Sequence, residues 1–166
     1  MTLRVLLSAL IASISLALIY FLCPSLDMVP EYYAKNIRSS LFSGFLTVGS
    51  FLLSLKAFIV VKLKENIFDT DIYKEKLKER KKLNSKLTLY GPVKRLSSLL
   101  FLTISSALTA SVSQLSIGLI QSWLATFFCI FVSVFATSML VSTLLLIRDT
   151  LSEWLDYLED AHNSKE

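Results

Sequence analysis

Four long apolar segments restrict what this chain can fold into more than any other feature of its sequence. They cover approximately residues 5–23, 39–61, 96–119 and 123–147, and the first of them contains no charged residue. A helix needs roughly 20 predominantly apolar residues to cross the hydrocarbon core of a bilayer, so each segment is long enough. Hydrophobic residues make up 54% of the sequence and charged residues 18%, which leaves little material for a separate water-soluble domain. We therefore predict an all-α integral membrane protein in which residues 1–166 form a single membrane domain.

The first apolar segment has two interpretations. A basic start followed by an apolar run is also typical of a secretory signal peptide. However, this run is longer than the apolar part of most signal peptides, and no small-residue cleavage pattern follows it. Leu22 before Cys23 also does not suit a lipoprotein site. We interpret the segment as a retained transmembrane helix that ends before Pro24, because proline interrupts helical hydrogen bonding.

The charge between the second and third apolar segments predicts the orientation. Residues 62–95, which we call the 62–95 hairpin, contain eleven Lys and Arg against five Asp and Glu, a net charge of +6. Positively charged loops remain in the cytoplasm, so we expect a basic cytoplasmic helical hairpin here. Four spans then place both termini in the cytoplasm, and we expect a multi-pass protein of the bacterial inner membrane. Because orientation accounts for the positive charge, we expect no direct nucleic-acid partner.

The sequence contains no arrangement of residues typical of catalysis. Its one histidine, His162, lies in the polar tail, and no carboxylate falls within an apolar segment. The two cysteines, Cys23 and Cys129, form no metal-ligand pattern and no disulfide framework. The four glycines do not form a phosphate-binding loop. We therefore expect a protein that is not an enzyme and that binds neither a metal nor a cofactor.

The tail, residues 148–166, is predicted to form an amphipathic helix with an acidic polar side. It contains two basic and six acidic residues, so it does not suit an anionic inner leaflet. Its apolar residues are spaced at i, i+3, i+4 and i+7, which places them on one helical face. This apolar stripe consists of Leu151, Trp154, Leu155 and Leu158.

Opposite charge on one side of the membrane suggests that the tail and the 62–95 hairpin act together. We predict that they recruit a soluble cytoplasmic protein, which makes the chain a membrane anchor or sensor. The candidate residues for this contact are those of the apolar stripe together with Lys78, Arg80, Lys81 and Lys82. The alternative is that hairpin and tail pair only with each other.

Small and hydroxyl-bearing residues recur along every apolar segment at spacings of three and four. Such residues allow helices to approach closely, either within one bundle or in a homo-oligomer. An oligomer also permits a second function, a small channel lined by the hydroxyl-rich third segment. Its candidate residues are Lys56, Ser105, Thr109 and Ser113. For Lys56 the alternative is a side chain that extends to the lipid headgroups.

The overall plan resembles that of a known family. Four spans, a basic cytoplasmic hairpin between the second and third, and a cytoplasmic tail resemble the small membrane subunit of the Kiwa anti-phage defence system. That resemblance implies an oligomer in the bacterial inner membrane that holds a soluble DNA-binding effector on its cytoplasmic side. It covers the whole chain at the level of architecture and implies no role for an individual residue.

Overall fold

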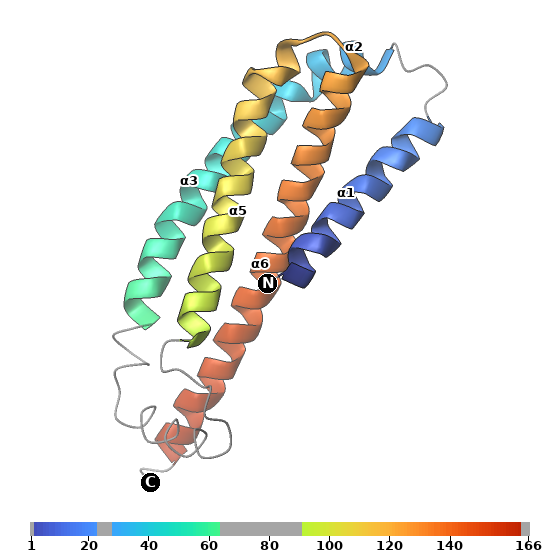
Figure 1. The fold of residues 1–166 in the computed structure, drawn as a ribbon. Coiled ribbons are helices and arrows are strands. Elements are labelled where there is room, and N and C mark those ends of the chain that lie inside the picture. The colour runs from blue at the N-terminus through green and yellow to red at the C-terminus, as the bar shows by residue number, and fades with distance from the viewer. Residues whose placement is uncertain (1, 23–27, 64–90, 164–166) are drawn as a thin grey trace.

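The computed structural model describes residues 2–22, 28–63 and 91–163, and within these ranges the regular elements are all helical. In chain order the elements are α1 (Thr2–Leu22), α2 (Met28–Asn36), α3 (Arg38–Leu63), α5 (Gly91–Leu115), the short 3₁₀ helix η2 (Ile117–Leu119) and α6 (Trp123–Asn163). Figure 1 shows the long helices running lengthwise through the molecule, with α2 at one end, which we call the α2 end.

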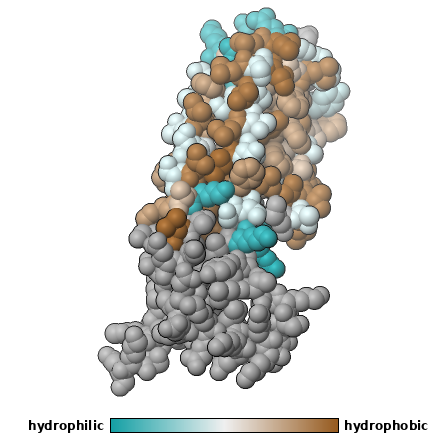
Figure 2. Space-filling model, turned by 60° about the vertical axis from the view of Figure 1, so that its left-hand side comes forward, coloured by the Kyte–Doolittle hydropathy of each residue, from teal (hydrophilic) through white to brown (hydrophobic). Residues whose placement is uncertain are grey.

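Four of these helices are long and apolar enough to cross a membrane, as the sequence predicted. The apolar stretches are Thr2–Leu22, Arg38–Ile59, Lys94–Leu119 and Trp123–Ser152. The shortest of them, α1, has 21 residues, about 32 Å at 1.5 Å per residue, which matches the roughly 30 Å of bilayer hydrocarbon. Figure 2 shows that apolar side chains cover much of the helical surface visible in that view. Such a surface is typical of a multi-pass membrane protein.

The third span, α5, is the centre of the bundle. It packs against both α3 and α6, and half of its apolar stretch is buried, compared with 11% for α1. Two groups of buried apolar side chains fill the space between these three helices. The first consists of Leu52, Leu96, Leu100 and Ile104, and the second of Phe45, Ala107, Ala110 and Ala136.

Small residues bring α3 and α5 into close contact. A Cβ atom added to Gly49 on α3 would lie 3.2 Å from Cδ2 of Leu108 on α5. The hydroxyl of Ser111 on α5 donates a 3.0 Å hydrogen bond to the backbone carbonyl of Phe42 on α3. Close approach and a hydrogen bond between helices are two of the forces that hold helices together in a membrane.

A buried pair of hydroxyls joins α5 to α6. The Oγ1 atoms of Thr103 and Thr143 are 2.6 Å apart, and each also lies within hydrogen-bonding distance of a carbonyl one turn earlier in its own helix. Because a hydroxyl has one hydrogen, one threonine donates to the other, which is left free to donate to its own helix. Both side chains are thereby satisfied in an apolar environment.

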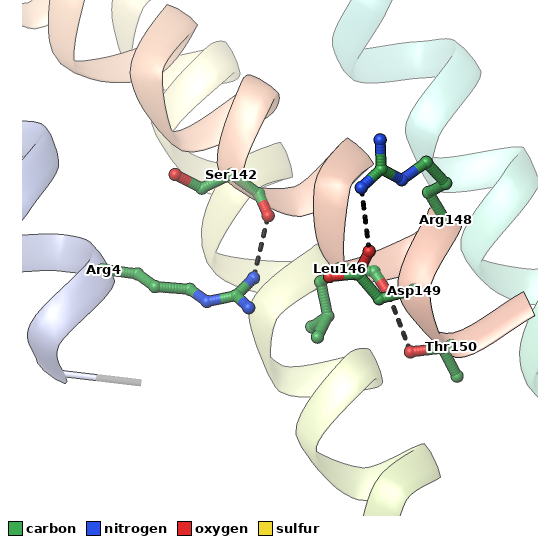
Figure 3. A network of polar contacts seen from close by, with 6 residues as sticks. All are labelled: Arg4, Ser142, Leu146, Arg148, Asp149 and Thr150. Carbon is green, nitrogen blue, oxygen red and sulfur yellow. Dashed lines mark hydrogen bonds and ion pairs between the residues drawn. The ribbon is translucent and has the colours of Figure 1, made fainter. Parts of the chain in front are cut away.

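The first span lies at the edge of the bundle and contacts α6. Ser8 and Ala12 are its buried residues, and the hydroxyl of Ser138 on α6 donates to that of Ser8 at 3.1 Å. Nearer the start of α1, the guanidinium of Arg4 donates a 2.8 Å hydrogen bond to the backbone carbonyl of Ser142 (Figure 3). Two polar contacts therefore join the first half of α1 to α6.

Two elements differ from what the sequence indicated. The connection between the first two spans contains a helix, α2, and backbone hydrogen bonds from Ile37 to Tyr33 and from Leu41 to Ile37 continue it into α3. Pro30 lies in the first turn of α2, where a missing N–H costs no intrahelical bond. The second difference is α6, a single helix of 41 residues that includes both the fourth span and most of the tail.

Candidate functional site

The C-terminal part of α6, which contains the predicted apolar stripe, lies at the end of the molecule opposite α2 (Figure 1). The backbone of α6 continues through the apolar stripe as far as Asn163, so helical spacing places all four stripe residues on one face. Of their side chains the structure describes that of Leu151, which is 46% exposed. Those of Trp154, Leu155 and Leu158 lie outside the described residues, as do Lys78, Arg80, Lys81 and Lys82 of the 62–95 hairpin.

Just before this stripe, α6 contains a short polar segment. The guanidinium of Arg148 lies 3.3 Å from the carboxylate of its neighbour Asp149, and both side chains are largely exposed (Figure 3). The hydroxyl of Thr150 donates to the carbonyl of Leu146 in the preceding turn at 2.7 Å. Both of these contacts are formed within α6.

Lys56 contacts an aromatic ring on the neighbouring helix. Its Nζ atom lies 4.9 Å from the centre of the Phe101 ring, close enough for a cation–π interaction. Phe101 itself is 63% exposed, so the ammonium lies at the outer surface of the α3–α5 pair. A lysine at such a surface, near the end of a span, can also extend toward the headgroups.

The three hydroxyls predicted to line a channel do not share one environment. Ser105 and Thr109 are exposed on the surface of α5. Ser113 is buried and donates to the carbonyl of Ala110 within its own helix at 2.8 Å, and its own carbonyl accepts a 3.5 Å hydrogen bond from the thiol of Cys129 on α6. The structure therefore brings Ser105 and Thr109 together and turns Ser113 toward α6.

A polar cluster at the α2 end was not among the predicted sites. The hydroxyl of Tyr33 on α2 donates to the side-chain carbonyl of Gln114 on α5. The amide of Gln114 in turn donates to Oγ of Ser133 on α6 at 3.0 Å, and Ser133 donates to the carbonyl of Cys129 at 2.8 Å. Tyr33, Gln114 and Ser133 thus join three helices through side chains that are almost fully buried.

Burial also changes the acidity of Tyr33, which lies outside the four spans. Loss of contact with water disfavours the charged phenolate and raises the pKa of Tyr33 from 10.0 to about 12. The hydroxyl therefore stays protonated, and remains a hydrogen-bond donor, at alkaline pH where an exposed tyrosine would ionise. A second polar link lies close by, where the guanidinium of Arg38 donates to the carbonyl of Gly118 at 2.9 Å.

The sequence contained one signal for this cluster. Gln114 is an amide within an apolar segment, and a buried amide in a membrane needs a partner on another helix. The identity of that partner was hidden because Tyr33 lies 81 residues away in the chain. Tyr33 also lies beside a span, where tyrosines are common at the membrane–water interface, so its position gave no sign of a buried contact.

Two neighbouring cavities border α2. The first, of about 640 Å³, is mostly apolar and extends from Ile19 on α1, past Met28 and Tyr32 on α2, to Ile130 on α6. The second, of about 780 Å³, is more polar and is lined by Gln121, Ser122 and Trp123 together with residues of α2. Within the described ranges, no group of three His, Cys, Asp or Glu residues has the geometry to hold a metal ion.

Comparison with known proteins does not extend this description. No protein-family model matches the chain, and neither a similar curated protein nor a similar solved structure was found. The class of the protein, a helical chain with four helices able to span a membrane, thus follows from its own sequence and structure.

Proposed function

We propose that the protein is a membrane anchor that recruits a soluble cytoplasmic partner through the C-terminal part of α6. In this proposal the 62–95 hairpin and both termini lie in the cytoplasm, as the positive charge of the hairpin favours. The tail of α6 contributes its apolar stripe, and the hairpin contributes the basic residues.

The observation that supports this proposal most directly is the length of α6. A bilayer requires about 20 of its residues, whereas the helix has 41. Its apolar stretch ends at Ser152, and the helix continues through the acidic, Trp-bearing part of the tail. A partner would therefore meet a helical face that is already formed, which lowers the entropy lost on binding.

Site-specific photocrosslinking in intact cells tests the proposal. A photoreactive amino acid is placed at Leu155 or Leu158 in the stripe and, as a control, at Val112, which is 62% exposed on the apolar surface of α5. We expect one and the same soluble protein to be captured from both stripe positions and from neither the control nor a chain that also carries Trp154→Asp. Crosslinks from the stripe that reach only the 62–95 hairpin would instead support pairing of hairpin and tail.

The exposed hydroxyls of α3 favour an oligomeric form of this anchor. Ser43, Thr47 and Ser50 are exposed, and each donates to a carbonyl of its own helix. Small side chains on an exposed helix face permit close approach of a second helix. We propose that this face of α3 contacts a second copy of the chain. Size determination in detergent tests this, with Thr47→Leu expected to weaken the oligomer and Leu53→Ala, at another exposed position of α3, serving as a control.

A channel is the second candidate function, and the exposure of Ser105 and Thr109 favours it. In an oligomer these two hydroxyls could line a water-filled path, with Lys56 near one end of it. Ion flux through liposomes that contain the purified protein distinguishes the two functions. A flux that falls with Thr109→Val would support the channel, whereas an absence of flux would contradict it.

The resemblance in overall plan to the Kiwa membrane subunit extends the anchor proposal to a biological setting. It suggests that the recruited partner acts in defence against phage. Deleting the gene and comparing phage plating efficiency tests this step separately from the crosslinking experiment. Loss of protection on deletion, and on deletion of residues 153–166 alone, is the expected result.

A further inference from the structure

The first span leaves a wedge-shaped space at the α2 end. Its contacts with α6 involve Arg4 and Ser8 in its first half, whereas Phe21 and Leu22 at its far end are strongly exposed. Figure 1 shows α1 diverging from α6 toward that end. The apolar cavity of about 640 Å³ lies in this space, between Ile19 on α1 and Ile130 on α6.

The position of the cavity determines what can enter it. Ile19 and Ile130 both belong to apolar stretches that can cross a membrane, whereas α2 lies between two such stretches. The cavity thus extends from the depth of lipid tails to the level of lipid headgroups. Its volume falls within the range of small-molecule sites, and an apolar space at this depth favours a hydrocarbon chain over water.

The rim of the cavity carries one acidic and one basic side chain. Glu31 and Lys35 on α2 line both the apolar cavity and the polar cavity of about 780 Å³ beside it. They are four positions apart in the sequence (i and i+4), which places their Cβ atoms about 5–6 Å apart on one helix face. Both are exposed, and the single ion pair in the described part of the chain is that of Arg148 with Asp149. Glu31 and Lys35 therefore remain free to bind a ligand that carries both charges.

We propose that these cavities form a site for one phospholipid with a phosphoethanolamine headgroup. One acyl chain occupies the space between Ile19 and Ile130, the phosphate binds Lys35, and the ammonium donates hydrogen bonds to Glu31. The polar cavity adds hydrogen-bonding groups from Gln121 and Ser122 near the headgroup, and Trp123 is an aromatic residue of the type that anchors helices at this level. This site lies at the opposite end of the bundle from the C-terminal part of α6 and does not depend on the proposed recruitment of a partner.

The charge pattern selects among common headgroups. Phosphatidylglycerol carries the phosphate but no ammonium, so it leaves Glu31 without a partner. Phosphatidylcholine carries a quaternary ammonium, which has no N–H to donate to the Glu31 carboxylate. Because exposed charge pairs contribute at most about 1 kcal/mol, we expect a preference of about fivefold for phosphatidylethanolamine over either lipid.

Native mass spectrometry of the full-length protein in detergent tests the proposal. Palmitoyl-oleoyl phosphatidylethanolamine, phosphatidylglycerol and phosphatidylcholine are titrated in turn, and the fraction of protein with one bound lipid is measured. Glu31→Gln is expected to abolish the preference. Lys35→Gln, which removes the contact with the phosphate that all three lipids share, is expected to weaken binding of all three. Lys56→Gln, which removes a cation from the half of α3 that is remote from α2, should leave both binding and preference unchanged. Equal binding of the three lipids by the unmodified protein would overturn the headgroup assignment.

A second pair of variants tests the acyl-chain cavity. Ile130→Trp fills the space and is expected to lower binding of all three lipids about tenfold, since a chain that cannot enter loses its apolar contacts. Leu124→Trp adds the same side chain at a position of α6 that is 61% exposed and lies outside the cavity lining. It should leave binding unchanged. Retention of lipid by Ile130→Trp, with an unfolding temperature equal to that of Leu124→Trp, would overturn the cavity assignment.

Discussion

The hydroxyl of Tyr33 donates a hydrogen bond to the side-chain carbonyl of Gln114, which joins the short helix α2 to the central span α5. Both residues are almost fully buried. Gln114 also donates to Ser133 on α6, so a single amide connects three helices. The α2 end of the bundle is therefore held by polar contacts, whereas the apolar clusters lie further along α3, α5 and α6.

Tyr33→Phe should destabilise the protein. The substitution keeps the ring but leaves the carbonyl of Gln114 buried without its donor, which costs about 1–3 kcal/mol of unfolding free energy. Unfolding in mixed detergent and SDS micelles, followed by circular dichroism, measures this change. Tyr32→Phe is the matched control, because Tyr32 is 63% exposed. Equal losses in the two variants would contradict a structural role for the contact.

Stability should fall at alkaline pH because of the same residue. The folded chain holds the proton of Tyr33 with a pKa of about 12, against 10.0 for an ordinary tyrosine. Its contribution is fully present below pH 10 and is lost as the pH rises from 10 through 12, since the unfolded chain releases the proton first. Tyrosinate absorbance should show a late-titrating tyrosine that is absent from Tyr33→Phe. A titration curve unchanged by that substitution would exclude this assignment.

Gly49→Leu should disrupt the packing of α3 on α5. A Cβ at this position already lies 3.2 Å from Leu108, so a larger side chain forces the helices apart at a cost of about 1–3 kcal/mol. Gly44→Leu provides the control, because a Cβ there meets no atom within 4 Å. Thermal unfolding in detergent compares the two, and a stability of Gly49→Leu equal to that of Gly44→Leu would show that the contact tolerates bulk.

Ser8→Leu should weaken the attachment of α1 to α6. Ser8 is fully buried and accepts a hydrogen bond from Ser138, so a leucine there removes that bond and separates the backbones. We expect a loss of about 1–3 kcal/mol in the SDS titration. Ser13→Leu serves for comparison, because Ser13 is exposed and bonds within its own helix. The interpretation fails if the two leucines have the same effect.

Thr103 and Thr143 should show measurable energetic coupling. Each single change to valine leaves the other hydroxyl able to donate to its own helix, so each should cost little. A double-mutant cycle isolates the hydroxyl pair, for which we expect about 0.6 kcal/mol, the average for hydrogen bonds between helices in a membrane. A coupling energy near zero would mean that each threonine acts alone.

Periodicity and length were sufficient to locate the four spans, because a bilayer imposes one requirement on every helix that crosses it. They could not show how the spans pack. α5 is central because its buried face carries Thr103, Ser111 and Gln114, each of which bonds to a neighbouring helix. The sequence shows that these polar residues are present on α5 but not which helix supplies their partners.

The candidate sites also differ in how far the sequence could predict them. The stripe of Leu151 and Leu155 depends on helical spacing alone, which a sequence displays directly. The cavity at the α2 end depends instead on the angle between α1 and α6, and that angle is set by contacts between residues far apart in the chain, such as Ser8 with Ser138. For Ser113, spacing alone was misleading. Its distance of four positions from Thr109 suggested that the two residues share an exposed face, but α6 covers Ser113.

The unbroken length of α6 has a mechanical consequence. A straight helix of 41 residues is about 60 Å long, so a change in tilt of about 10° around its α2 end would move the other end by about 10 Å. The Tyr33, Gln114 and Ser133 contacts hold α6 close to that pivot. A small change in the tilt of α6 would therefore displace its C-terminal segment by about the diameter of a helix.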